Sequence, residues 1–241
     1  MAKSEFAVEH KIVALAIIGI IVIAGLAVWT PAADANRLDV SGSAVETVDP
    51  DEVQVVVGAE TQATTAAAAQ QQNADIISRI RANLAGKGLT EEQIETVQFS
   101  VQPVTQYNPQ TGASAVVGYS AVHLLKITSS AISRAGEYVD AASVGGANRV
   151  DSIAFTLSTA KEYEVRQSVL GAAAANARSK ADGIAQGLGV RVTRLVRASE
   201  GYFYIPYAPS PVFERSAGAP TVISPGQLEV SASVSATFEI G

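Results

Sequence analysis

The sequence predicts an α+β protein, with mixed and mainly antiparallel sheets packed against two or three helices, one of them long, behind an N-terminal transmembrane helix. Three observations predict it. An uncharged apolar run occupies residues 12–29, strand-like and helix-like periodicities alternate through residues 36–241, and one apolar stripe continues from residue 161 to residue 188. We therefore divide the chain into an N-terminal membrane segment, residues 1–35, and one extracytoplasmic domain, residues 36–241.

The apolar run, IVALAIIGIIVIAGLAVW, has 18 residues and no charge. A helix of that length nearly crosses the hydrocarbon core of a bilayer. Lys3, His10 and Lys11 precede it, whereas Asp34, Arg37 and Asp39 follow it. This positive-inside bias places the C-terminal domain outside the cytoplasm, as a single-pass membrane protein. The alternative is a signal peptide cleaved near Ala35, which would release a secreted or periplasmic domain.

The composition excludes several classes of function. The formal net charge is −6, which argues against nucleic-acid binding, since that needs a clustered basic face. There is no cysteine, and His10 and His123 are too few for a histidine metal site. We interpret His123 as an ordinary, half-exposed strand histidine. The sequence has no nucleophile elbow, HExxH, P-loop or EF-hand motif, so we expect no catalytic residue, no metal and no cofactor.

The first half of the domain alternates strands and helices. Residues 51–62 predict a strand with one apolar face, and the Asp49-Pro50-Asp51 turn before it favours a hairpin with residues 38–48. A helix follows over residues 64–88, with an apolar stripe of Ala69, Asn73, Ile76, Ile77, Ile80 and Leu84. Thr90 and Gln93 predict a capping box ahead of another strand. A polar loop, residues 107–115, joins that strand to the next in a long hairpin.

The second half contains a short helix, a strand and then the long helix. The long helix begins at Lys161, and its predicted stripe is Val165, Val169, Ala173, Ala177, Ile184 and Leu188. Gly183, Gly187 and Gly189 then fall at the C-terminal end of a helix. A dinucleotide fingerprint needs glycines at a helix N-terminus, where the dipole is positive. We therefore expect Gly189 to be a left-handed helix cap and not part of a nucleotide site.

A proline-rich segment, residues 200–226, gathers five of the thirteen Phe and Tyr residues of the chain. Prolines keep such a segment out of a central strand. Aromatic side chains are enriched at interface cores, so the segment is a candidate interaction loop, with self-packing as the open alternative. The candidate residues are Tyr202, Phe203, Tyr204, Tyr207 and Phe213.

Several stretches together resemble the SIMPL-domain family. They are VSGSAVETVDPDEVQVVVGAETQATTAAAAQQQNADIISRI, TVQFSVQPV, GYSAVHLLKI, GANRVDSIAFTLS, ANARSKADGIAQGLGVRVTRLVRASEG and ISPGQLEVSASVSATFEI. The resemblance covers nearly all of residues 38–240. It implies an extracytoplasmic mixed α/β protein, similar to periplasmic immunogenic and oxidative-stress-defence proteins, some of which form ring-like oligomers. The family has no established catalytic residues to transfer to this chain.

These observations predict a non-enzymatic cell-envelope protein, anchored or exported, that self-assembles, interacts with partners and is connected with envelope stress protection. We expect a homo-oligomer, with membrane contact through residues 12–29. The closing strand, residues 228–240, has one apolar face and would need cover if it lay at a sheet edge. The alternative is an extracytoplasmic module that binds a small ligand.

Overall fold

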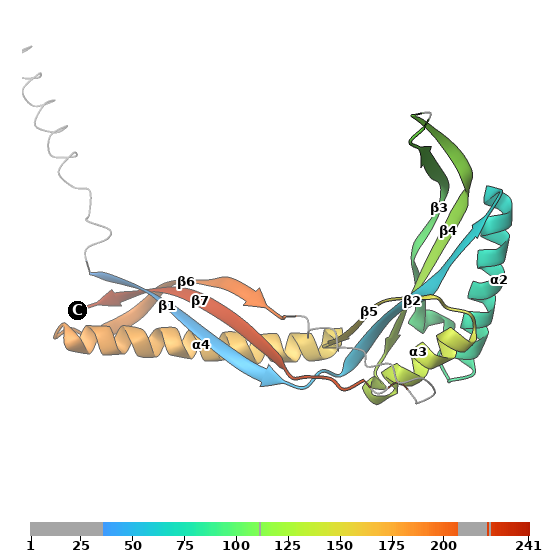
Figure 1. Ribbon diagram of the computed structural model, residues 1–241. Coiled ribbons are helices and arrows are strands. Elements are labelled where there is room, and N and C mark those ends of the chain that lie inside the picture. Colours follow the sequence, from blue (N-terminus) through green and yellow to red (C-terminus); the bar gives the residue numbers. More distant parts are fainter. Residues whose placement is uncertain (1–35, 111, 207–220, 222) are drawn as a thin grey trace, which may run out of the picture.

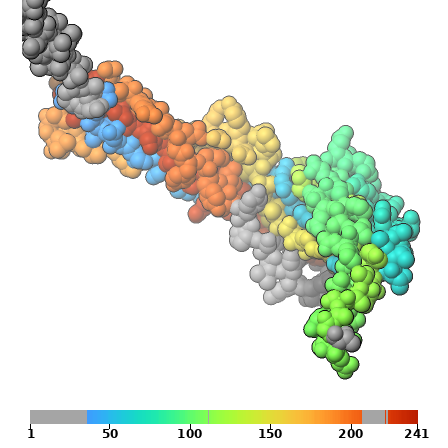
Figure 2. Space-filling model, turned by 90° about the horizontal axis from the view of Figure 1, so that it is seen from above, coloured from blue at the N-terminus to red at the C-terminus, as the bar shows by residue number. Residues whose placement is uncertain are grey.

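The computed structural model describes residues 36–110, 112–206, 221 and 223–241, which form an elongated molecule with two lobes (Figures 1 and 2). Each lobe contains one antiparallel sheet, and the described residues include three α-helices. The predicted α+β class with one long helix is therefore confirmed. No helix within these residues is long and apolar enough to cross a bilayer, and the predicted membrane segment, residues 12–29, lies outside them.

The elements follow one another in the order in which Figure 1 labels them. They are β1 (Arg37–Val48), β2 (Glu52–Ala63), α2 (Ala66–Ala85), β3 (Ile94–Asn108), β4 (Ala113–Ser129), α3 (Ala135–Val144), β5 (Arg149–Thr156), α4 (Thr159–Gly187), β6 (Val192–Tyr204) and β7 (Leu228–Ile240), with short 3-10 turns at Glu91–Gln93 and Ile132–Arg134. The predicted Thr90–Gln93 capping box is present at the first of these turns.

One lobe, the α4 lobe, consists of the three-stranded sheet β1-β7-β6 with α4 along one face. β7 turns Leu228, Val230, Ala232, Ala236 and Phe238 toward the core, because alternate residues of a strand point to the same face. The predicted closing strand is therefore confirmed as a one-sided strand. It lies in the centre of the sheet, so the edge strands that need cover are β1 and β6.

The buried stripe of α4 differs from the prediction at its C-terminal end. Val165, Val169, Ala173 and Ala177 are buried as expected, and Ala181 and Ala185 complete the stripe. Ile184 and Leu188 are exposed. Buried residues every four positions advance about 40° around a helix at each step. The contact line therefore winds around α4 as the twisted sheet does, and it leaves Ile184 and Leu188 on the solvent side.

The second lobe, the helical lobe, consists of the sheet β3-β4-β2-β5 with α2 and α3 on one face. Its core combines Val53, Val55 and Val57 of β2 with Ile77, Ile80 and Leu84 of α2 and with Tyr138 and Phe155. Asn73, which the periodicity placed in the apolar stripe of α2, is fully buried there. Its Nδ2 donates to the carbonyl oxygens of Ala59 (2.9 Å) and Ala121 (3.0 Å), and so joins the helix to two strands.

The predicted hairpin of β1 with β2 is wrong, because the two strands belong to different sheets. β1 pairs with β7, and β2 pairs with β4 and β5. The turn between them instead connects the lobes. Asp51 of this turn accepts hydrogen bonds from the backbone N–H and the hydroxyl of Ser158, the N-cap residue of α4. This contact fixes the start of the long helix.

The end of α4 agrees with the predicted role of its glycines. Gly187 is the last helical residue, and Gly189 has a φ of 75°, the left-handed conformation that favours glycine. The last turn of the helix presents carbonyl groups at this end, because backbone N–H groups point toward a helix N-terminus. The glycines therefore end a helix, as expected.

Candidate functional site

The structure describes three of the five predicted interaction residues. Tyr202, Phe203 and Tyr204 form the end of β6 and do not lie in a loop, whereas Tyr207 and Phe213 lie outside the described residues. Phe203 points toward the core, and the guanidinium of Arg166 lies over its ring, 4.8 Å from the centroid. Tyr202 and Tyr204 are 55% and 60% exposed, so these two rings are accessible to a partner.

Both edges of the three-stranded sheet are protected against pairing with another strand. On the β1 edge, two side chains of α4 form hydrogen bonds with the strand backbone. Lys180 donates to the carbonyl of Ser41 (2.8 Å), and Asn176 accepts from the N–H of Ser43 (3.2 Å). On the β6 edge, the pairing with β7 is interrupted by three register shifts. Side-chain cover and bulges are two ways in which proteins blunt exposed strand edges. The edges of this sheet are therefore poor assembly surfaces.

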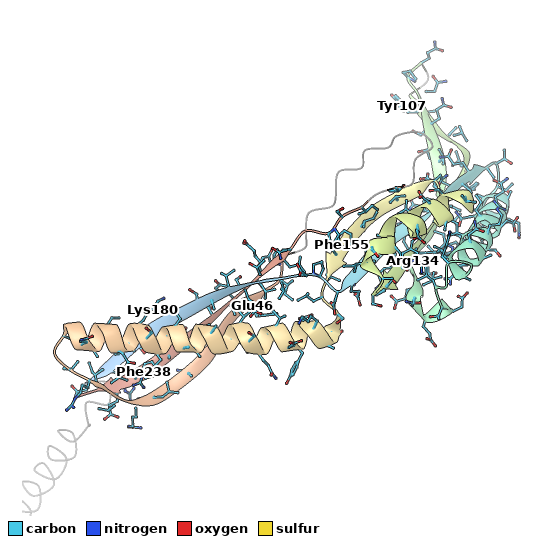
Figure 3. All side chains as sticks on the ribbon, turned by 90° about the horizontal axis from the view of Figure 1, so that it is seen from below. Glu46, Tyr107, Arg134, Phe155, Lys180 and Phe238 are labelled. Carbon is cyan, nitrogen blue, oxygen red and sulfur yellow. The ribbon has the colours of Figure 1, made fainter. Side chains whose placement is uncertain are left out.

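The β3–β4 hairpin carries a different surface, which the sequence did not single out. Its outer part, residues 105–110 and 112–117, is exposed at every position, and we call it the arm. A β-bulge at Val117 marks the start of the arm. Tyr107 and Val116 lie on one face of the arm and are 62% and 55% exposed. Figure 3 shows Tyr107 at the tip, far from the α4 lobe.

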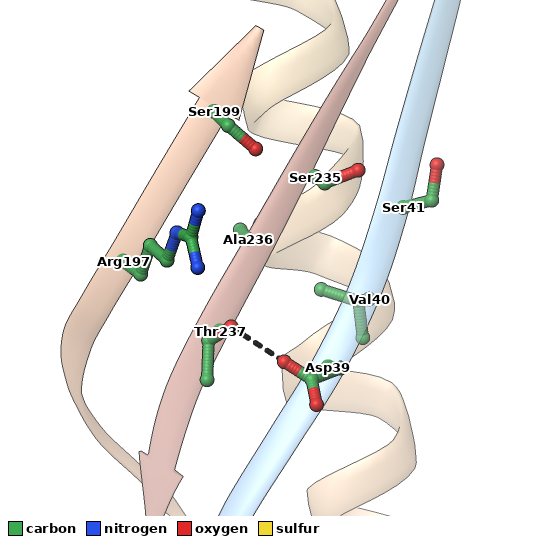
Figure 4. A pocket seen from close by; sticks show the side chains of 8 residues that line it. All are labelled: Asp39, Val40, Ser41, Arg197, Ser199, Ser235, Ala236 and Thr237. Atoms are coloured by element: carbon green, nitrogen blue, oxygen red, sulfur yellow. Dashed lines mark hydrogen bonds between the residues drawn. The ribbon is translucent and has the colours of Figure 1, made fainter. Parts of the chain in front are cut away.

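The face of the three-stranded sheet opposite α4 forms a shallow groove of about 420 Å³, lined by polar side chains and by Val40 and Ala236 (Figure 4). Two rows of directly paired residues cross it. The first row is Asp39, Thr237 and Arg197, and the second is Ser41, Ser235 and Ser199. The Thr237 hydroxyl donates to Asp39 (2.5 Å). The groove therefore has a carboxylate on one side, a guanidinium on the other and hydroxyl groups throughout.

Metal-binding and titratable side chains outside the groove are dispersed over the described residues. The structure places no group of three or more metal-binding side chains together in its described residues. His123 is half-buried, as predicted; its Nε2 lies 3.0 Å from the Thr96 hydroxyl, and its ring contacts Phe99 edge to face. Burial, with the positive charge of Arg81, lowers the pKa of His123 below its usual value. His123 is therefore a neutral strand residue at pH 7.

Sequence reasoning could have found the arm but not the groove. The polar loop YNPQTGASA between two predicted strands indicated a long hairpin, and its length was a signal that the tip would extend beyond the sheet. The groove depends on the register of β1 and β6 against β7, strands far apart in the chain. No local pattern indicates that Asp39 and Arg197 share a row.

Comparisons with known proteins give a family match and a relative. Residues 38–238 match the family SIMPL, described as a protein of unknown function (DUF541). The chain is also 25% identical over 214 residues to a protein of Edwardsiella ictaluri (strain 93-146), the uncharacterized protein YggE; the match covers 88% of this chain and 87% of that protein.

Proposed function

We propose, from the premise that this chain belongs to the SIMPL family, that it is a non-enzymatic cell-envelope protein, anchored or exported, that assembles with copies of itself. The arm is the observation that carries this proposal. A two-stranded ribbon is only marginally stable alone in water, yet this one extends with both faces exposed and with Tyr107 and Val116 on its surface. Contact with a second copy would cover these side chains.

The geometry of the molecule supports the arm over the edges of the three-stranded sheet as the assembly contact. The edges of the three-stranded sheet are protected by Asn176, Lys180 and the bulges of β6. The arm lies at the opposite end of the elongated molecule from the start of β1 (Figure 1). A contact at that end leaves the end of the molecule where β1 begins available, which is compatible with anchoring by residues 12–29.

Introducing charge on the arm should reduce the assembly to smaller species. We expect the double variant Tyr107→Arg/Val116→Lys of the full chain, in detergent, to have a lower mass than wild type, because two buried interface contacts would become charged. Light scattering coupled to size-exclusion chromatography measures the mass. Circular dichroism should remain native, since both side chains are exposed in the single chain.

The matched control is Val144→Lys, because Val144 is 83% exposed but lies on α3, away from the arm. Its mass should equal that of wild type. A wild-type chain that is monomeric at high concentration would contradict self-assembly. If wild type is an oligomer and the arm variant has the same mass, self-assembly stands but the arm is not its contact surface.

The membrane proposal rests on residues 12–29 and has a separate test. We expect the full chain to fractionate with membranes and to resist carbonate extraction, because 18 apolar residues nearly span the hydrocarbon core. Replacing two residues of the run, Ile18→Lys and Ile21→Lys, should release the protein or block its export. Recovery of a soluble wild-type chain beginning near Asn36 would instead establish cleavage after a signal peptide.

The proposal includes a role in envelope stress protection, because the sequence resembles stress-defence proteins. The second candidate function, binding of a small extracytoplasmic ligand, is favoured by one observation. The groove on the open sheet face has a volume of about 420 Å³, which is typical of small-molecule sites. Its lining also includes a carboxylate, that of Asp39, and a guanidinium, that of Arg197.

A further inference from the structure

We propose that the groove on the open face of the α4 lobe binds a small zwitterion, a molecule with one ammonium and one carboxylate group, between Asp39 and Arg197. This inference does not depend on self-assembly, since the groove lies on the sheet face and the arm belongs to the other lobe.

The register of the sheet places Asp39 and Arg197 on either side of the central strand. Asp39 of β1 and Arg197 of β6 both pair with Thr237 of β7, so they flank the central strand in one row. Neighbouring strands lie about 4.8 Å apart, so the two backbones are about 10 Å apart. The two side chains form no ion pair with each other, and Figure 4 shows them on opposite sides of the groove. A ligand can therefore enter between them.

Arg197 differs from its neighbour Arg194 in its partners. Arg194 forms an ion pair with Glu239, which lies in the adjacent row of the same sheet face. Arg197 makes no hydrogen bond or ion pair with any residue that the structure describes. Its planar guanidinium presents donors in the fork geometry that matches a carboxylate. The geometry therefore assigns Arg197 to the carboxylate end of the ligand.

Asp39 is oriented to bind the ammonium end of the ligand. The Thr237 hydroxyl donates to its Oδ1, which fixes the carboxylate on the groove wall. An ammonium group would donate to the same carboxylate, in a charge-assisted hydrogen bond. Thr237 lies between the two charges in their own row, and the next row adds only short hydroxyl side chains, Ser41, Ser235 and Ser199. These leave space for the ligand and can hydrogen-bond to its polar atoms.

The same lining disfavours two other ligand classes. A simple anion would leave the carboxylate of Asp39 facing a like charge, which is unfavourable at short range. A large apolar ligand would bury the charges and hydroxyl groups without partners. A zwitterion satisfies both sides of the groove at once, and it can come from a free amino acid or from a short peptide with free ends.

Binding can be measured by isothermal titration calorimetry with the full chain in detergent micelles. The probes are L-alanine and L-alanyl-L-alanine, with N-acetyl-L-alanine and L-alaninamide as analogues that each lack one charge. We expect each analogue to bind about tenfold or more weakly than L-alanine, because one charged hydrogen bond is lost. Tighter binding of the dipeptide assigns the groove to peptide ends, and tighter binding of L-alanine assigns it to free amino acids.

Two variants test the assigned roles. Arg197→Gln should weaken the binding of L-alanine about tenfold and abolish the preference for L-alanine over L-alaninamide. Asp39→Asn should abolish the preference for L-alanine over N-acetyl-L-alanine. A merely structural role would weaken all probes equally. Arg191→Gln is the matched control, because it removes a like charge directly before β6, outside the groove lining, and should leave binding unchanged. Absence of wild-type binding to both zwitterions, or an Arg197→Gln variant that binds as wild type, would overturn the proposal.

Discussion

Replacing Asn73 with Asp should destabilise the helical lobe increasingly as the pH rises. Asn73 is fully buried, and its Nδ2 donates to two carbonyl oxygens, those of Ala59 and Ala121. A carboxyl group at this position loses the amide donors. When it ionises, it also places a negative charge against two acceptors in a water-free core, which disfavours the charged form strongly.

The direction of the pH dependence follows from the pKa of the introduced carboxyl. Burial and the facing carbonyl groups raise its pKa in the folded chain above the ordinary value of about 3.9. The folded state therefore binds the proton more tightly than the unfolded state. The electrostatic part of the loss is absent at a pH below the unfolded pKa, grows as the pH rises toward the folded pKa, and is then constant. We expect a total loss of about 3 to 6 kcal/mol at pH 7.

Denaturant unfolding of wild type and Asn73→Asp between pH 4 and pH 8 measures this loss. The matched control is Gln72→Glu, which makes the same change of charge at the preceding, exposed position of α2. The control should stay within about 0.5 kcal/mol of wild type. Equal pH profiles for the two variants would show that Asn73 is accessible to water, contrary to its burial.

Asn73 also shows how far the sequence could predict the fold. The helical period placed it on the buried face of α2 together with Ala69 and Ile77, which is correct. Periodicity depends only on local spacing, so it also predicted α4 and its glycine cap. The two strand carbonyls that Asn73 bonds belong to β2 and β4, whose pairing is a non-local property. The reason for a polar residue in an apolar stripe therefore became visible only in the structure.

The same limit explains the hairpin that the sequence predicted wrongly. Asp49-Pro50-Asp51 is a turn signal, and a turn between two adjacent strands usually makes a hairpin. Here the residues of β1 complement β7 at the other end of the domain, and the turn carries the chain from one lobe to the other. Local turn chemistry specifies that the chain bends. It does not specify which sheet each strand joins.

The candidate interaction residues illustrate a limit of composition. The concentration of aromatic residues after Glu200 correctly indicated an unusual segment, but composition does not give the direction of each ring. Strand alternation in β6 turns Phe203 toward the core and leaves Tyr202 and Tyr204 exposed. The arm has a weaker aromatic signal, yet it is exposed on both faces. The signal for the arm was the length of its polar loop, which indicated a hairpin tip beyond the sheet, and not its content of aromatic residues.

Replacing Gly42 with Ala should strongly destabilise the α4 lobe, because α4 crosses β1 at this glycine. A Cβ added to Gly42 would lie 2.1 Å from the carbonyl oxygen of Ala173 and 2.4 Å from the backbone nitrogen of Ala177. These are helix backbone atoms, which cannot rotate away as a flexible side chain does. The clash therefore has to separate α4 from the sheet. The small side chains of Ala173 and Ala177 and the missing side chain of Gly42 together set this close approach.

We expect Gly42→Ala to cost about 3 kcal/mol or more, at or above the upper end of ordinary overpacking. The control is Gly171→Ala in α4 itself, where an added Cβ meets no atom within 4 Å. Alanine has the higher helix propensity, so this variant should gain up to about 1 kcal/mol. Denaturant unfolding of both variants, followed by circular dichroism, measures the two changes in opposite directions. A Gly42→Ala variant as stable as wild type would mean that α4 does not contact β1 so closely. The sheet face that carries the groove would then lack the rigid support that holds Asp39 and Arg197 in one row.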